Sequence, residues 1–124
     1  MIRNLSLMVI LFLTLNLPLA AQATQLSEDS AKLRFAATQH EIILILIKES
    51  EFERVLPEFQ KILDLQFSAE NERLIVQEVW ILSKNLMDLQ QFNLAHEMIR
   101  LSLERLKEPE SHFSLLMLQG KVFK

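Results

Sequence analysis

Residues of the kinds that helices bury in a core recur at helical spacing in two stretches of the chain that begin 40 residues apart. The first set comprises Phe52, Val55, Phe59 and Ile62, and the second comprises Phe92, Ala95, Ile99 and Ser102. Gaps of three, four and three residues place four side chains on one face of an α-helix. The offset falls in the range of helical-hairpin repeats. The pattern therefore predicts a small stack of helices.

The same periodicity predicts five helices after the N-terminal segment. They are expected over about 28–48, from a capping box formed by Ser50 and Glu53, from a cap at Ser68, over about 92–107, and from a cap at Ser111. Pro57 implies either a kink in the second helix or a true start near Leu56. Pro109 is expected to stop the fourth helix.

The third predicted helix has the clearest apolar seam in the chain. Its seam residues are Ile75, Val79, Leu82, Leu86 and Leu89. The least secure segment is IILILI at 42–47, which fits a buried strand as well as a helix. A helix is expected there because no second strand is visible to satisfy its backbone.

The N-terminal segment 1–23 has the order of a secretory signal peptide. Arg3 precedes an apolar run, Pro18 interrupts it, and small residues lead to a cleavage site after Ala23. The alternative is a single-pass N-terminal membrane anchor, although the apolar run is shorter than the roughly 20 residues that span a bilayer. Residues 24–30 are expected to form a flexible leader and residues 31–124 the helical domain. The predicted location is secreted or periplasmic, with no membrane contact after cleavage.

Composition supports an all-α fold that relies on packing alone. The chain has one Gly, three Pro, no Tyr and no Cys, so turn punctuation typical of strands is scarce and disulfides are excluded. The net charge of −3 includes Arg3 of the predicted signal, so the remaining chain is mildly acidic. An acidic surface disfavours nucleic acid as a partner.

The third and fourth helices resemble a tetratricopeptide repeat. The matching residues are Val79, Leu82 and Leu86 on one helix, then Phe92, Ala95, Ile99 and Ser102 on the next. The first hairpin departs from the pattern, with Val55 and Ile62 where the family has small residues. The resemblance implies antiparallel hairpins stacked as a short right-handed superhelix, with a glycine near Gly120 that relieves crowding between helices.

The resemblance also implies protein or peptide binding in a groove lined by the first helix of each pair. Lys84 and Asn85 are the outward candidates on the third helix, and a solvated helix face is the alternative for both. Self-association through the C-terminal helix is a second possibility. Its expected exposed packing surface comprises Leu115, Leu116, Leu118 and Phe123.

Catalytic and metal-binding patterns are not found in the sequence. His40 and His96 are each followed by Glu, but the second histidine of a zinc-protease helix is missing, so surface histidines are expected. A single glycine excludes a Gly-rich phosphate loop. We therefore expect no enzyme and no cofactor. The expected function is an exported helical-repeat scaffold, with a structural oligomerising element or the N-terminal fragment of a longer repeat protein as alternatives.

Overall fold

The computed structural model describes residues 19–122, which form five α-helices and one 3₁₀ turn, with no strand in that range. The elements are α2 (Leu19–Lys48), η1 (Phe52–Arg54), α3 (Val55–Leu63), α4 (Ala69–Asp88), α5 (Phe92–Arg105) and α6 (Pro109–Val122). The all-α prediction is confirmed, and segment 42–47 is helical. The chain divides into two compact units, residues 1–32 and residues 33–124.

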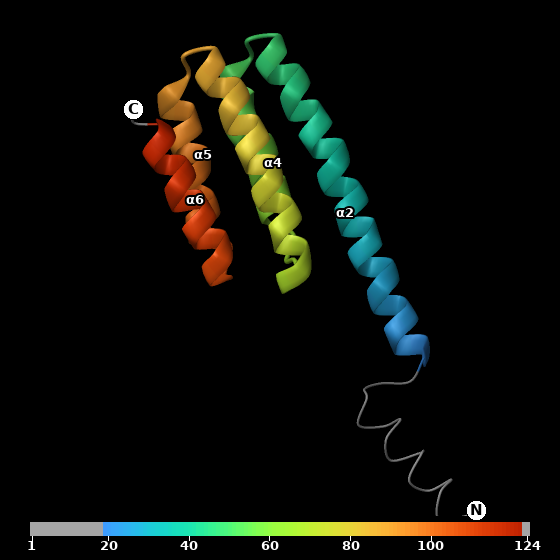
Figure 1. Cartoon of the computed structure of the whole chain (residues 1–124). Coiled ribbons are helices and arrows are strands. Elements are labelled where there is room, and N and C mark those ends of the chain that lie inside the picture. The colour runs from blue at the N-terminus through green and yellow to red at the C-terminus, as the bar shows by residue number, and fades with distance from the viewer. Residues whose placement is uncertain (1–18, 123–124) are drawn as a thin grey trace, which may run out of the picture. The chain divides into compact units, whose positions relative to one another are not determined.

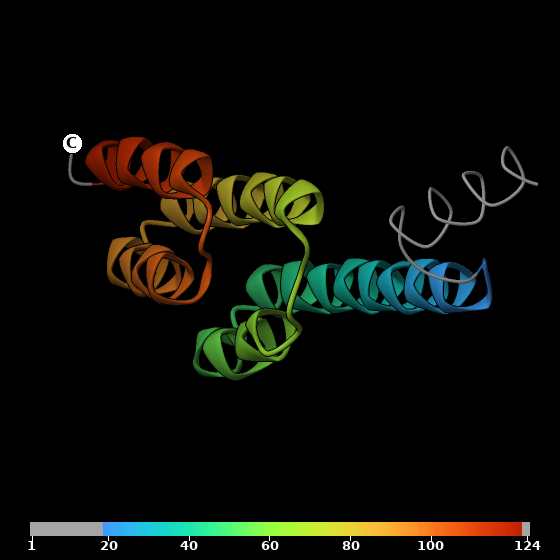
Figure 2. The same cartoon turned by 90° about the horizontal axis from the view of Figure 1, so that it is seen from below.

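Helices of the 33–124 unit run side by side in alternating directions (Figures 1 and 2). The last part of α2, α4 and α6 run one way, and α3 and α5 run the other. α4 packs against α5 and α6, while α5 also packs against α6 and α3. A single cluster of buried apolar side chains contains residues from all five helices.

The turns that end α2 and α4 have the same geometry. Ser50 and Gln90 have φ angles of 60° and 61°, in the left-handed region that favours glycine. The amide of the next residue donates to Leu46 O in the first turn and to Leu86 O in the second, each at 2.8 Å. Both turns are therefore Schellman caps, and they lie 40 residues apart like the apolar pattern.

The capping-box prediction at Ser50 and Glu53 is wrong, because Ser50 closes α2 instead of opening the next helix. A 3₁₀ turn follows, and α3 begins at Val55, which places Pro57 in the first turn where its missing amide is harmless. The cap at Ser68 is confirmed, since its Oγ accepts a hydrogen bond of 3.4 Å from the amide of Asn71.

Pro109 was expected to stop the preceding helix, and in the structure it is also the first residue of α6. Its fixed φ and missing amide suit the first position of a helix. Ser111 therefore lies inside α6 and is buried, so the predicted cap there is wrong. The start of α6 at Pro109, in place of the predicted cap at Ser111, sets which α6 residues face the core.

Helix α2 includes residues 24–30, where a flexible leader was expected. Polar character alone does not break a helix, and no Gly or Pro occurs between Leu19 and Lys48. The expected signal peptide lies largely outside the described residues, so cleavage after Ala23 stays a prediction. Among the described residues, no helix is both long enough and apolar enough to cross a bilayer.

The repeated apolar pattern is confirmed by burial. The fully buried members are Val55, Phe59 and Ile62 in the first set, and Ala95, Ile99 and Ser102 in the second. The α4 seam is also buried as far as Leu86, but Leu89 is exposed because it lies beyond the last turn. Phe92 is exposed too, at the first position of α5.

The two hairpins differ in side-chain size at equivalent buried positions. Ala95 and Ser102 are fully buried, and the backbones of α4 and α5 approach along much of their length. Val55 and Ile62 stand at the corresponding positions of the first hairpin and are also fully buried. In that hairpin the Gln39 amide of α2 donates to the Glu58 carboxylate of α3 at 2.7 Å and to its carbonyl at 3.1 Å.

Replacing Gln90 with glycine should stabilise the fold. A side chain at φ 61° costs about 0.5–1 kcal/mol relative to glycine in a helix-closing position. We expect Gln90→Gly to raise the free energy of unfolding in urea by that amount. Lys107→Gly is the control, because Lys107 is also an exposed loop residue but has no positive φ. A loss of stability in Gln90→Gly would contradict the assignment.

Candidate ligand-binding trough along α4 and α6

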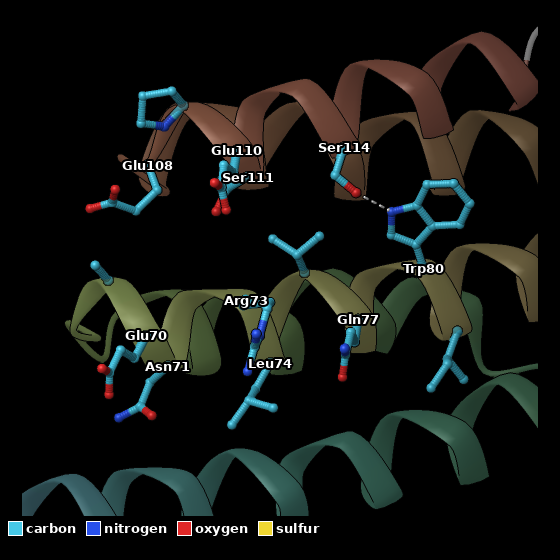
Figure 3. Close-up of a pocket in the computed structure, with 14 residues that line it drawn as sticks. Glu70, Asn71, Arg73, Leu74, Gln77, Trp80, Glu108, Glu110, Ser111 and Ser114 are labelled. Carbon is cyan, nitrogen blue, oxygen red and sulfur yellow. Dashed lines mark hydrogen bonds between the residues drawn. The ribbon is translucent and has the colours of Figure 1, made fainter.

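Trp80 links α4 to α6 at the centre of the candidate site. Its indole Nε1 donates a hydrogen bond of 2.8 Å to Ser114 Oγ (Figure 3). Lys121 Nζ lies 4.8 Å from the ring centroid, a distance typical of a cation–π contact. The half-buried indole is thus held between a hydroxyl and an ammonium group, which fixes its ring as a rigid apolar surface.

Two hollows lie along α4 and α6 and share Trp80 and Ile81. The larger has a volume of about 1460 Å³ and extends to the start of both helices. Its lining includes Arg73, Leu74 and Gln77 of α4, and Ser111 near the start of α6 (Figure 3). We call the two hollows together the α4–α6 trough.

The second hollow is smaller and mainly apolar. It has a volume of about 470 Å³. Its lining comprises Trp80, Ile81, Lys84, Met87, Leu118 and Lys121. Ile81 is about half exposed, so an apolar side chain of a ligand can contact it without any rearrangement. Burial of such a side chain is worth roughly 25 cal/mol per Å² of apolar surface.

Opposite charges occupy the two ends of the trough. Glu70, Glu108 and Glu110 lie at the end where α4 and α6 begin, with Arg73 as the one cation among the lining residues there. Lys84 and Lys121 line the other end. Acids in the first turn and a lysine in the last turn of α6 also complement the helix dipoles, so this charge separation helps to stabilise the helices.

The structure separates the two predicted partner-binding residues. Lys84 is exposed and lines the smaller hollow. Asn85 lines neither hollow, and its Nδ2 donates to Ile81 O at 2.8 Å. Sequence reasoning did not select Trp80 or Ile81. The sequence did offer a signal for this site, because Trp80 is the only tryptophan and lies on a helical stripe beside the buried seam.

The predicted exposed surface of the C-terminal helix is corrected in part. Leu115 and Leu118 are buried against the core, because a helix beginning at Pro109 turns them towards α4 and α5. Leu116 is exposed as expected, and Phe123 lies outside the described residues. Gly120 relieves no crowding, since a Cβ added there would meet nothing within 4 Å.

Phe113 and Met117 are exposed and were missed by sequence reasoning. The sequence around them, FSLLML, is apolar at most positions, so spacing alone does not say which side faces the core. Only the contacts of α6 with α4 and α5 decide it.

His40 lies on the side of α2 that faces Glu78 of α4 and is buried there, so the predicted surface location is wrong. Its Nδ1 lies 3.9 Å from Glu78 Oε2, beyond hydrogen-bond range, and neither atom has a hydrogen-bond partner. Burial lowers the pKa of His40, with Glu41 opposing this effect, and burial raises the pKa of Glu78 to about 7. Both shifts favour the neutral forms, so the pair is a weak polar contact and not a strong salt bridge.

Metal-ligand clusters are absent from the described part of the chain, where no three His, Cys, Asp or Glu side chains could hold an ion together. Comparisons with protein-family models, curated proteins and solved structures give no match. The geometry of the trough is therefore the basis for a functional proposal. Its floor is apolar and its two ends carry opposite charges.

The buried carboxyl of Glu78 should make stability fall as pH rises. The folded pKa of Glu78, about 7, exceeds the ordinary glutamate pKa of 4.5, so the folded state binds more protons between these pH values. His40 acts in the opposite direction, because its lowered pKa favours the folded state as its proton is lost. As the pH rises from 5 to 8, the free energy of unfolding of Glu78→Gln should therefore increase by about 2 kcal/mol relative to that of wild type.

Urea unfolding at both pH values measures this difference. Glu53→Gln is the matched control, since Glu53 is exposed and the same charge is removed at the surface. An equal pH response in the two variants would mean that burial of Glu78 has no energetic consequence.

Proposed function

We propose that the chain is an exported scaffold of stacked helical hairpins that binds a segment of another protein in the α4–α6 trough, without catalysis. The observation that carries the proposal is the fixed indole of Trp80 beside the exposed Ile81. A rigid, partly exposed aromatic surface in a concave site loses little entropy when a ligand side chain packs on it.

A tetratricopeptide-like array is the proposed class of the scaffold. The 40-residue repetition of Schellman turns and of buried positions supports it, as do the small, fully buried residues Ala95 and Ser102 of α5. Export to the periplasm or the exterior is proposed from the signal-like order of residues 1–23. Stacking as a right-handed superhelix belongs to the same proposal.

The charges of the trough define the chemistry of the proposed ligand. An apolar or aromatic side chain would pack on Trp80 and Ile81, with an acidic group next to it near Lys84 and Lys121. A basic group further along the segment would lie near the acidic end, where Glu70 is one of the lining residues. Complementary charge would set the direction of binding and raise the association rate more than the affinity.

Selection from a random peptide library displayed on phage, with the purified full chain as bait, tests the proposal. We expect enrichment of peptides with an apolar residue next to an acidic one. Ile81→Asp should weaken the affinity of an enriched peptide at least tenfold, or about 1.4 kcal/mol, because an unpaired carboxylate would be buried under the ligand. Lys84→Glu should weaken the acidic peptides selectively.

Leu89→Asp is the matched control for Ile81→Asp. Leu89 is similarly exposed and adjoins the same helix, but it lines neither hollow. Its affinity should stay within about twofold of wild type, a change of about 0.4 kcal/mol. Asn85→Ala should also have no effect, since its amide is bonded to its own helix. No enrichment, or equal binding to Ile81→Asp, would exclude the trough as the binding site.

A further inference from the structure

An uncovered apolar seam follows the side of α6 that faces away from the core. It comprises Phe113, Leu116, Met117 and Gly120, which we call the α6 seam. The exposed fractions of its three large side chains are 67%, 55% and 51% in chain order. Positions separated by three, four and seven residues lie on one face of a helix, the spacing by which helices dock on each other.

The seam is distinct from the trough and from the core. Leu115, Leu118 and Val122 bury the opposite side of α6, and Ser114 is bonded to Trp80. No seam residue lines either hollow. Three large exposed side chains on adjacent turns form a contiguous apolar patch of the kind that marks an interaction surface.

The order of residues in the seam is self-complementary. If two α6 helices cross in antiparallel fashion about a two-fold axis between Leu116 and Met117, Phe113 of each copy lies opposite Gly120 of the other. The space above Gly120 is empty, since a Cβ there would meet nothing within 4 Å, so it can accept an aromatic ring. Leu116 of one copy then meets Met117 of the other.

The flanking charges favour the same antiparallel arrangement. Glu110 lies one turn before the seam and Lys121 directly after it, both on the same side of α6. A two-fold axis across the seam brings Glu110 of each copy near Lys121 of the other, whereas parallel helices would align like charges. Large-to-small packing and reciprocal opposite charges are thus satisfied together by one partner, a second copy of this chain.

We infer that the protein forms a two-fold symmetric dimer through antiparallel packing of its α6 seams. The flanking charge pairs use Glu110 and Lys121, which also line the trough, but the dimer leaves its apolar floor of Trp80, Ile81 and Met87 uncovered in each copy. The dimer therefore presents two troughs. A partner with two binding segments would engage both, which raises its overall affinity without new contacts. The inference stands independently of whether the trough binds peptides.

Sedimentation equilibrium of the purified full chain, without any ligand, tests the dimer. Wild type should show a concentration-dependent mass of two chains. Leu116→Glu should raise the dimer dissociation constant at least about 100-fold, because each copy would bury an unpaired carboxylate. Ile45→Glu is the matched control, since Ile45 is 58% exposed but lies on α2. It should stay dimeric with a dissociation constant within about threefold of wild type.

Reversal of the flanking charges tests the antiparallel direction. Glu110→Lys and Lys121→Glu should each weaken the dimer about fivefold at low salt, because each change acts twice in a symmetric interface. The double variant should return to within about twofold of wild type. A parallel dimer would predict no such rescue.

Cysteine cross-linking gives a second measure of direction, since the chain has no cysteine of its own. Phe113→Cys and Gly120→Cys should form a disulfide dimer when mixed but little when kept apart. In the antiparallel dimer like positions lie about 10 Å apart along the helix, too far for a disulfide.

Three results would overturn the inference. One is a wild-type chain that is folded by circular dichroism but monomeric at every concentration. Another is a dimer that Leu116→Glu, with helical content retained, leaves unchanged. If Leu116→Glu does not fold, Met117→Lys takes its place in the same comparison. The third is a dimer that cross-links at like positions.

Discussion

Close packing of α4 against α5 is the contact on which the rest of the 33–124 unit depends. The small residues Ala95 and Ser102 of α5 are both fully buried, and α5 packs against α4, α6 and α3. Since α4 and α5 are close, α6 can contact both at once, and this position brings Ser114 to Trp80. The first hairpin has the larger residues Val55 and Ile62 at the matching positions, and a hydrogen bond from Gln39 to Glu58 links its two helices.

His40 and Trp80 occupy equivalent positions 40 residues apart, and each reaches the next helix that runs in the same direction. Their chemistry differs. Trp80 makes a hydrogen bond and a cation–π contact, while His40 faces Glu78 with neither atom bonded. The α4–α6 contact is therefore rigid and can serve as a binding floor. The α2–α4 contact contains buried groups whose neutral forms are favoured, so its strength depends on pH.

Helix α6 has three faces with different roles. Leu115 and Leu118 complete the core, Lys121 borders the trough, and the seam around Leu116 is exposed. A dimer through the seam would present two troughs, so the proposed scaffold and the alternative of an oligomerising element are compatible. Both proposals rely on α6 being packed on one side only, which leaves apolar surface exposed for a partner.

The sequence by itself determined the all-α class, the 40-residue repeat and the buried sides of α3, α4 and α5, because strict spacing of apolar and polar residues leaves one choice of face. It did not determine whether Ser50 and Pro109 end one helix or begin the next. Each residue type is compatible with both positions, and only the turn geometry distinguishes them. Only the tertiary structure decided that His40 is buried and that Phe113, not Leu115, is exposed. In a helix that is apolar on several sides, the neighbouring helices select the buried face, and those neighbours are distant in sequence.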